Sequence, residues 1–207
     1  MYIPKHFLGA SDEEAFSFMQ KYSFGTIVTS DNGKPVASHL PFLIQKNEIG
    51  ILISSHFARA NPQAEAIADK EVLIIFSEPH AYISPRHYEK EQNVPTWNYM
   101  SVHAYGKCNL IEDEPAKFEL LERTISNYDE AYQEQWKGLP FDFKEKMLKG
   151  IVAFNVEVTE IQAKNKLSQN RTSTEQQNII AELSSSSNAH EAQIAEYMKV
   201  NSTKCKS

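Results

Sequence analysis

The sequence predicts a mainly β protein of the α+β class, in which a small barrel of antiparallel strands carries peripheral helices. Short β-prone segments separated by polar turns occupy most of the chain up to residue 110. Few connections between them are long enough for the crossover that parallel strands need. With 207 residues, 41% of them hydrophobic, the chain can bury one substantial core. These observations favour a barrel over a doubly wound sheet.

The expected elements begin with a helix and a meander of three strands. Ser11 and Glu14 have the spacing of a capping box, and the apolar stripe that follows ends before Gly25. The pair Asn32-Gly33 is a strong hairpin signal between the first two strands. Strands are predicted at residues 26–30, 35–44, 49–54, 71–77, 80–84, 97–110 and 151–158. The first three of these strands form the meander.

Helices interrupt or follow the strands. Asp113 is the predicted N-cap of the longest helix, and Gly150 ends the next one. The predicted helices cover residues 114–135, 143–149, 174–183 and 189–199. We therefore divide the chain into a barrel domain, 1–171, and a helical C-terminal extension, 172–207, that packs on the barrel or on a partner subunit.

Composition excludes several classes of protein. A net charge of −6 argues against a generally basic nucleic-acid-binding surface. The longest apolar runs are of strand length, far below the roughly 20 residues that span a bilayer. The start of the chain carries no apolar signal region, so a cytoplasmic protein is expected. Cys108 and Cys205 form no CxxC pair, and they predict neither a disulfide framework nor a metal site.

The first candidate site is an aromatic strand face between residues 97 and 110. One set of alternating residues is apolar: Met100, Val102, Ala104, Cys108 and Leu110. The other set consists of Trp97, Tyr99, Ser101, His103 and Tyr105. A flat face of this kind suits a planar heterocycle or a subunit interface. The alternative is a strand packed on both faces, whose polar groups are satisfied internally.

The second candidate is an anion cradle where a strand turns into a helix. Asn61 and Pro62 have the types preferred at the N-cap and first position of a helix, whose N–H groups attract anions. A phosphate needs charge together with several directed donors. The side chains that supply them are those of Ser54, Ser55, His56, Arg59 and Asn61. The alternative is a capped connecting helix with a solvated arginine.

The third candidate is the segment 164–171, KNKLSQNR. Lys164, Lys166 and Arg171 bring three positive charges, and Ser168 adds a hydroxyl, directly after the last predicted strand. Such a segment can close over the polar edge of a ligand, touch a partner subunit or bind a nucleic-acid phosphate. A solvated loop leading into the terminal helices is the alternative.

Nine short segments, in order from residue 1 to residue 171, carry a family resemblance. They are MYIPKHF at Met1, SFGTIVT at Ser23, ASHLPF at Ala37, HFARANPQ at His56, HAYISP at His80, VPTWNY at Val94, VHAYGK at Val102, KGIVAF at Lys149 and KLSQNR at Lys166. Together they resemble the PaiB-type family of FMN-binding negative transcriptional regulators. The resemblance implies a split β-barrel like that of the pyridoxamine-phosphate oxidases, assembled as a homodimer with FMN sites at the interface.

The resemblance gives the three candidate sites expected roles. The cradle of Ser54, Ser55, His56, Arg59 and Asn61 is expected to hold the FMN phosphate. The residues expected around the flavin ring are His39, Trp97 and Tyr99, with Ser84 and His87 on the intervening loop. Lys166, Ser168 and Arg171 are expected to serve the ligand pocket first and DNA only weakly. The chain departs from the family where a tryptophan is usual, since Arg86 and His87 stand there, and the helices after Thr172 match loosely.

Three functions remain open at this point. The resemblance implies a regulator that lowers expression of genes for sporulation or degradative enzymes. A flavin-dependent oxidoreductase with an indirect regulatory effect is the alternative, because no helix-turn-helix pattern is visible and the charge is acidic. A heme-binding barrel with His39, His56 or His103 as ligand ranks third, since lone histidines are more often hydrogen-bonding residues than ligands.

Overall fold

The computed structural model describes residues 1–8, 11–48 and 50–204. The chain forms two compact units. The first unit comprises Met1–Ala15, Ser77–Val102 and Gln162–Ser207, and the second comprises Phe16–Phe76 and His103–Ile161. Cys205 lies outside the described residues.

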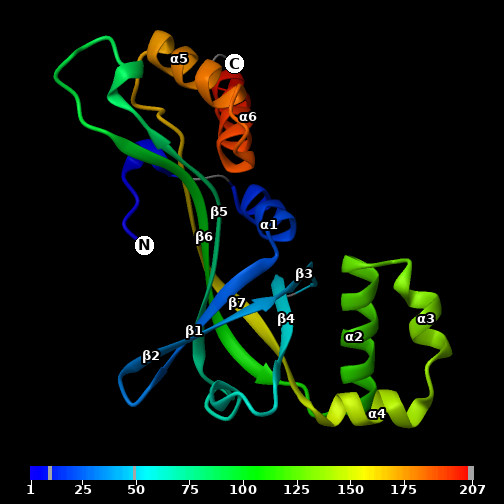
Figure 1. Cartoon of the computed structure of the whole chain (residues 1–207). Coiled ribbons are helices and arrows are strands. Elements are labelled where there is room, and N and C mark those ends of the chain that lie inside the picture. Colours follow the sequence, from blue (N-terminus) through cyan, green and yellow to red (C-terminus); the bar gives the residue numbers. More distant parts are fainter. Residues whose placement is uncertain (9–10, 49, 205–207) are drawn as a thin grey trace. The chain divides into compact units, whose positions relative to one another are not determined.

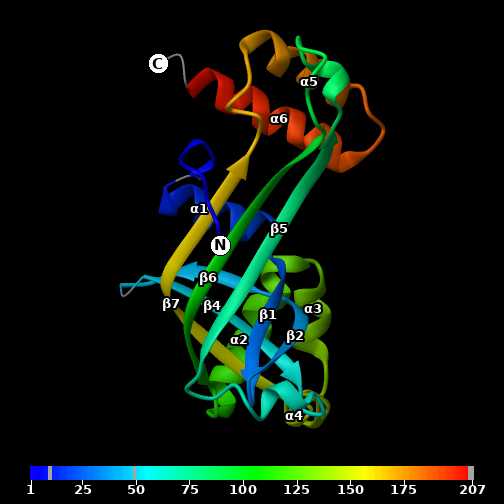
Figure 2. The same cartoon turned by 90° about the vertical axis from the view of Figure 1, so that its left-hand side faces the viewer.

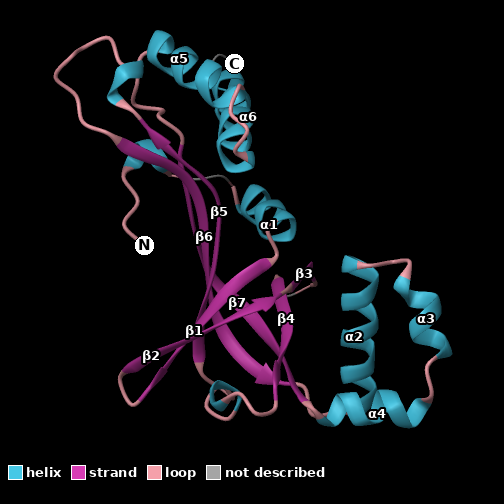
Figure 3. Cartoon of the chain, viewed as in Figure 1, coloured by secondary structure: helices cyan, strands magenta, loops and turns pink. Residues whose placement is uncertain are grey.

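Within the described residues, seven strands form one sheet and six α-helices accompany it (Figure 3). The strands are β1 Phe24–Asp31, β2 Lys34–Pro41, β3 Leu43–Lys46, β4 Ile51–Ala58, β5 Glu71–Ile83, β6 Thr96–Leu110 and β7 Ile151–Lys166. Their order is β2-β1-β5-β6-β7-β4-β3, and the pairs β1–β2, β1–β5, β3–β4 and β4–β7 are antiparallel. The sheet is mostly antiparallel and not closed, which confirms the predicted split-barrel class.

The helices lie in three groups along the chain. The α-helices are α1 Asp12–Lys21, α2 Glu114–Tyr128, α3 Tyr132–Gly138, α4 Phe141–Lys149, α5 Ser173–Ser184 and α6 Ala189–Lys204. The described residues also form three short 3-10 helices: η1 Lys5–Phe7, η2 Pro62–Ala64 and η3 Pro85–His87. Across the part of the chain that is described, no helix combines the length and the apolar character that crossing a membrane requires.

The second unit has an aromatic and aliphatic core between its strands. Phe57 on β4 stacks on Phe154 on β7 with ring centroids 5.0 Å apart, and Phe42 meets the edge of Phe76 at 5.6 Å. Helix α2 begins where Asp113 accepts from the Ala116 N–H, as predicted. Figure 1 shows α2, α3 and α4 as one helical group. The buried residues that join this group to the strands are Leu43, Leu120 and Ala153.

The first unit is built on the parts of β5, β6 and β7 that fall within it. Helices α5 and α6 lie side by side in Figures 1 and 2. Thr172 begins α5 with a capping box completed by the buried Glu175. The apolar residues buried in these two helices are Ile179, Leu183, Ile194, Ala195 and Met198. Both predicted C-terminal helices are therefore present, and the domain boundary after Arg171 stays a prediction.

Two strand predictions were wrong. The predicted strand 35–44 is divided at Phe42, whose N–H donates to the Ser23 carbonyl while its side chain is fully buried. Pro41, which has no N–H to donate, is the last residue of β2, and β3 then pairs with β4 instead of β2. The predicted meander is consequently two separate hairpins.

The opposite error occurred at Pro79, where two strands were predicted and one, β5, exists. Buried residues alternate up to Phe76, then the alternation shifts by one residue and resumes at Pro79. A shift of this kind exchanges the two faces, so the sequence pattern resembled two strands. The predicted total of seven strands was therefore correct through two compensating errors.

Further boundaries differ from prediction. The strand predicted at 49–54 is β4, Ile51–Ala58, so Ser54, Ser55 and His56 lie within the strand and not at its end. Strand β7 continues to Lys166, so Lys164 and Lys166 belong to the strand and not to a loop after it. The predicted helix 114–135 ends at Tyr128, where the Asp129 N–H closes the last turn, and a separate α3 follows. The Asn32-Gly33 hairpin is confirmed, since both residues have the positive φ values of 48° and 82° that a tight hairpin turn requires.

Candidate functional site

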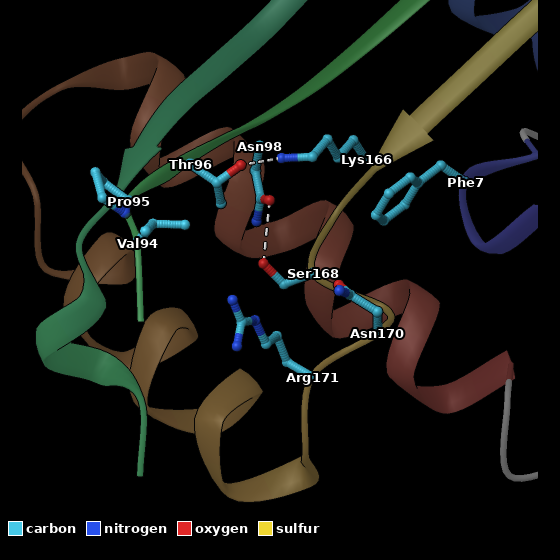
Figure 4. A pocket seen from close by; sticks show the side chains of 9 residues that line it. All are labelled: Phe7, Val94, Pro95, Thr96, Asn98, Lys166, Ser168, Asn170 and Arg171. Atoms are coloured by element: carbon cyan, nitrogen blue, oxygen red, sulfur yellow. Dashed lines mark hydrogen bonds between the residues drawn. The ribbon is translucent and has the colours of Figure 1, made fainter. Parts of the chain in front are cut away.

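The first unit contains a cavity of about 220 Å³ at the start of β6 and the end of β7 (Figure 4). It is lined by Phe7, Val94, Pro95, Thr96, Asn98, Lys166, Ser168, Asn170 and Arg171. Four of these belong to the KLSQNR segment and four to the VPTWNY segment. Two motifs far apart in the sequence therefore form the walls of one cavity.

The side chain of Lys166 extends from the end of β7 to the first residues of β6 (Figure 4). Its ammonium donates to the Thr96 hydroxyl and to the Trp97 carbonyl. Burial, reinforced by the nearby charges of Lys164 and Arg171, lowers the pKa of Lys166 below its ordinary value. The charged form of a lysine held in this way is stabilised when an anionic or electron-rich ligand group enters the cavity.

The loop after β7 is held in one conformation by its own side chains. Ser168 has a φ of 61°, a left-handed conformation that is uncommon for a residue with a Cβ. Its buried hydroxyl donates to Asn98 Oδ1 at 3.1 Å, and the Leu167 N–H donates to Gln169 Oε1 at 2.8 Å. Strained residues of this kind are frequent at ligand sites, because the surrounding structure must hold them there.

The other two cations of the segment 164–171, Lys164 and Arg171, also have partners within the first unit. Arg171 lies over the Tyr88 ring, with Cζ 3.7 Å from the centroid, and Nη1 donates to Asn93 Oδ1 at 2.9 Å. Lys164 is buried and donates to the Tyr2 carbonyl at 3.2 Å. All three charges thus have partners inside the unit.

The predicted aromatic face of β6 is present, with one exception. Trp97 is 52% exposed, and Tyr99 is half-buried with its ring 5.1 Å from Lys164 Nζ. Tyr82 on β5 meets the edge of the Trp97 ring at 5.9 Å. Ser101 was predicted on this face but is buried, whereas His103 and Tyr105, farther along the strand, are half-buried like Tyr99.

Ser84 caps the short helix η3 between β5 and β6. Its hydroxyl accepts from the Arg86 N–H at 3.4 Å. Arg86 pairs with Glu182 on α5, and the Asn178 amide donates to the His87 carbonyl. The Arg86 side chain and the His87 carbonyl therefore connect this loop to α5.

The predicted anion cradle lies in the second unit, and its two serines are buried. Ser54 donates to Asn155 Oδ1 at 2.6 Å, and Ser55 donates to the Pro41 carbonyl at 2.7 Å. The hydroxyl hydrogens of both serines are thus already used within the sheet. Burial also lowers the pKa of the half-buried His56.

The helix predicted after Asn61 is only the three-residue 3-10 helix η2. Asn61 is its N-cap, as predicted, and accepts from the Gln63 N–H at 3.0 Å. Arg59 is exposed, and its guanidinium donates to the carbonyls of Lys149 at 2.6 Å and Ile151 at 2.9 Å. A turn this short offers fewer aligned N–H groups than the expected helix, and Arg59 is the main source of charge there.

The predicted site residues divide between the two units. The second unit holds His39, Ser54, Ser55, His56, Arg59 and Asn61, and His39 is exposed on the edge strand β2. The first unit holds Ser84, Trp97, Tyr99, Lys166, Ser168 and Arg171. Within the first unit, Lys166, Ser168 and Arg171 line one cavity, whereas Trp97 meets Lys166 through its backbone carbonyl.

Several residues that line the cavity were not predicted from the sequence. Asn98 is the most informative of them, because it is fully buried on the core-facing side of β6. A polar residue at an apolar position of an alternating strand was the available signal, since buried amides need partners. Phe7 carried no such signal, because only the fold brings residue 7 to the end of β7.

Residues 1–160 match the protein family described as "Putative FMN-binding domain". The chain belongs to this family. One relative, "Protease synthase and sporulation protein PAI 2" of Bacillus subtilis, is 44% identical over 203 residues, covering 96% of this chain and 97% of that protein.

Two solved structures share the fold. The flavocytochrome Anf3 from Azotobacter vinelandii has a TM-score of 0.61 at 18% identity, covering 75% of this chain and 67% of the other. The FAD and heme binding protein from Mycobacterium smegmatis has a TM-score of 0.61 at 15% identity, covering 76% and 72%. At these identities the likeness concerns the fold.

Proposed function

We propose that this protein is a cytoplasmic FMN-binding regulator that lowers expression of genes for sporulation or degradative enzymes. Membership of the FMN-binding domain family supports FMN as the cofactor. The similarity to the Bacillus subtilis sporulation protein extends over nearly the whole length of both chains and supports the regulatory role. The remaining question is which residues meet the ligand.

The observation that carries the proposal is the inward direction of the KLSQNR cations. Lys166 and Arg171 line the cavity of the first unit, and the desolvated Lys166 is bonded to polar atoms of β6. DNA binding requires cations that reach phosphates from the surface, and each such contact makes binding more sensitive to salt. We therefore assign Lys166, Ser168 and Arg171 to FMN first, and expect any DNA binding to be weak and steeply salt-dependent.

The donors around the cavity fit a polar part of FMN. Lys166 and Arg171 supply positive charge, and the amide of Asn170 adds a directed group. Pockets that enclose a whole drug-sized ligand usually measure about 300–1,000 Å³. At about 220 Å³ the cavity accommodates one part of the cofactor. We propose that Ser84, Trp97 and Tyr99 contribute to the flavin environment on the same unit.

The second unit carries a separate set of proposed FMN contacts. We retain Arg59 and Asn61 for the phosphate, with His39, Ser54, Ser55 and His56 around them. Arg59 is the exposed charge of this set. The internal hydrogen bonds of the two serines make Arg59 the decisive residue to test.

We propose that the protein is a homodimer. Among the described residues, the large apolar side chains exposed in the first unit are Tyr2, Leu8, Tyr82, Val94, Trp97 and Val200. Groups of this kind that face water are typical of interaction surfaces. We expect an interface above roughly 2,000 Å² in total. Light scattering that gives the 23.6 kDa mass of a monomer at low micromolar concentration would refute the dimer.

The test compares FMN binding and DNA binding in one double variant. The purified protein should show a flavin absorption spectrum, and FMN should bind it in a fluorescence titration. The double variant Lys166→Ala, Arg171→Ala should lose FMN affinity. The control, Lys199→Ala, removes a charge from an exposed position of the same unit. Loss of DNA retention in a gel with FMN affinity unchanged would overturn the assignment.

A flavin-dependent oxidoreductase remains the second candidate. The observation that favours it is the cavity, because flavin chemistry needs little from a protein beyond binding, orientation and access. The discriminating assay follows consumption of NADH or NADPH by the FMN-bound protein under air. Turnover by the wild type that is lost in the Lys166→Ala, Arg171→Ala variant favours the enzyme. Absence of turnover by the FMN-bound wild type favours the regulator.

A further inference from the structure

Two histidines and a glutamate meet in the first unit, and none of them is among the residues that line the cavity. Glu78 and His80 are two residues apart on β5, so their side chains lie on the same face of the strand. His190 is the second residue of α6. One nitrogen or oxygen atom of each residue lies within 4.8 Å of those of the other two.

The contacts inside this cluster leave one nitrogen unused. His190 Nδ1 lies 3.0 Å from Glu78 Oε2. Nevertheless, this nitrogen is shielded from water and makes no hydrogen bond within the described residues, since proximity without alignment does not form one. The His80 and His190 rings are 4.7 Å apart between centroids and tilted by 59°. A buried ring nitrogen without a hydrogen bond requires an explanation, and a metal ion aligned with its lone pair provides one.

Two imidazoles and a carboxylate are a ligand set that Zn²⁺ uses. Tetrahedral zinc binds nitrogen at about 2.0–2.1 Å and carboxylate oxygen at about 2.0–2.2 Å, which separates neighbouring donor atoms by roughly 3.3 Å. The Glu78–His190 distance is close to this value. His80 is exposed, so a rotation of its side chain can bring its nitrogen inward from the 4.8 Å limit.

We propose that Glu78, His80 and His190 bind a Zn²⁺ ion, with the fourth position open to water, and that the ion joins the beginning of α6 to β5. Magnesium and calcium do not fit this donor set, because they prefer oxygen ligands. The alternative arrangement is a surface ion pair between Glu78 and His190, which contributes little to stability. None of the three residues is among the proposed FMN contacts.

The position of His190 near the beginning of α6 opposes a cation only weakly. The partial positive charge at a helix N-terminus disfavours a cation, and the effect is small at an exposed position. The Asn188 side chain also accepts from the His190 N–H at 2.9 Å, which satisfies one donor of the first turn. The dipole therefore weakens the site without preventing it.

Calorimetric titration of the untagged, full-length protein with zinc chloride is the principal test. We expect one Zn²⁺ per chain, and at least about tenfold weaker binding in His80→Ala, His190→Ala and Glu78→Gln, because even outer-shell partners of a metal are worth about 10–100-fold. His6→Ala removes an exposed histidine of the same unit and should bind zinc like the wild type. Absence of zinc binding by the wild type, or wild-type zinc affinity in all three variants, would overturn the proposal.

Trp97 reports where the ion binds. Its ring centroid lies 5.9 Å from that of His80, and the chain has one other tryptophan, Trp136. In a Trp136→Phe background, Cu²⁺ should quench the fluorescence of Trp97, and His80→Ala should abolish that quenching. Equal quenching with and without His80 would place the ion elsewhere. If His190→Ala fails to fold by circular dichroism, the exposed His80→Ala variant decides the outcome.

Discussion

The guanidinium of Arg171 lies over the ring of Tyr88, with Cζ 3.7 Å from the ring centroid, while Nη1 donates to Asn93 Oδ1. The arginine thus connects the KLSQNR loop to the segment that precedes β6. Lysine cannot reproduce both contacts, because its charge is compact and lacks the planar fork. This relationship gives the first prediction.

We predict that Arg171→Lys lowers the free energy of unfolding by about 0.5–2 kcal/mol, the range of a partly buried cation–π contact. FMN affinity should fall as well, because the loop that carries Ser168 loses its anchor. Urea denaturation and FMN titration measure the two effects. Arg86→Lys, in an exposed pair with Glu182, is the control and should change neither. Identical behaviour of the two variants would refute the role of the Tyr88 contact.

Replacing Lys166 should affect FMN affinity far more than the free energy of unfolding. Because burial lowers its pKa, the charged form is disfavoured in the folded protein. Lys166→Met removes that charge at similar length, but also the bonds to Thr96 and to the Trp97 carbonyl, so stability should change little. FMN affinity should fall by about 10- to 150-fold, as 1.5–3 kcal/mol implies. A variant that loses stability but keeps its FMN affinity would contradict this.

The pH dependence of the same group has a defined sign. Between the lowered pKa of Lys166 and the ordinary lysine value of 10.5, the unfolded chain binds more protons than the folded one. The contribution of Lys166 to stability therefore rises with pH through that window. The wild type should gain stability relative to Lys166→Met as the pH is raised toward 10.5, and denaturation at a series of pH values measures the difference.

The sequence predicted the fold class because its strongest signals are local. The Asn32-Gly33 turn and the Asp113 cap act over a few residues and are confirmed. The errors arose where tertiary structure overrides the local pattern. Burial of Phe42 divides one strand, and the change of face after Phe76 made one strand resemble two.

The candidate site was only partly predictable for the same reason. The charges and hydroxyls of KLSQNR could be seen in the sequence, and three of its residues do line a cavity. Asn98 and Phe7 reach that cavity only through the fold. Conversely, the serines of the proposed phosphate cradle were counted as donors, but their hydroxyl hydrogens are used by Asn155 and Pro41. Sequence spacing does not reveal how such internal bonds are distributed.

Arg59 separates a binding role from a structural one. Arg59→Ala should weaken FMN binding by about 1.5–3 kcal/mol if the guanidinium meets the phosphate. It also removes the bonds to the carbonyls of Lys149 and Ile151, so some stability should be lost. Comparing FMN affinity with the melting temperature distinguishes the two roles. Reduced stability with unchanged FMN affinity would place the phosphate elsewhere.

Cys108 should be chemically inert in the folded protein. Burial, together with the nearby charge of Asp69, raises the pKa of its thiol from 9.0 to about 12. The thiolate is the reactive form, so its population at neutral pH falls about a thousandfold. In a Cys205→Ser background, alkylation by iodoacetamide should be slow until urea unfolds the protein. Rapid alkylation of the native protein would show that the thiol is accessible.

Gly106, the one glycine of β6, should not tolerate a side chain, because β7 approaches it closely. A Cβ built there would lie 2.2 Å from the Glu157 carbonyl oxygen and 2.8 Å from Val156 Cγ1. The first neighbour is backbone, so relief requires a shift between two paired strands. Overpacking usually costs about 1–3 kcal/mol, and a backbone clash belongs at the upper end. Gly106→Ala should therefore lower the melting temperature by about 6–12 °C, at roughly 2–4 °C per kcal/mol for a chain of this size.

Gly138→Ala is the matched control, since a Cβ there meets nothing within 4 Å, and it should melt at the wild-type temperature or slightly above it. Equal melting temperatures for the two variants would mean that β6 and β7 are not packed as described.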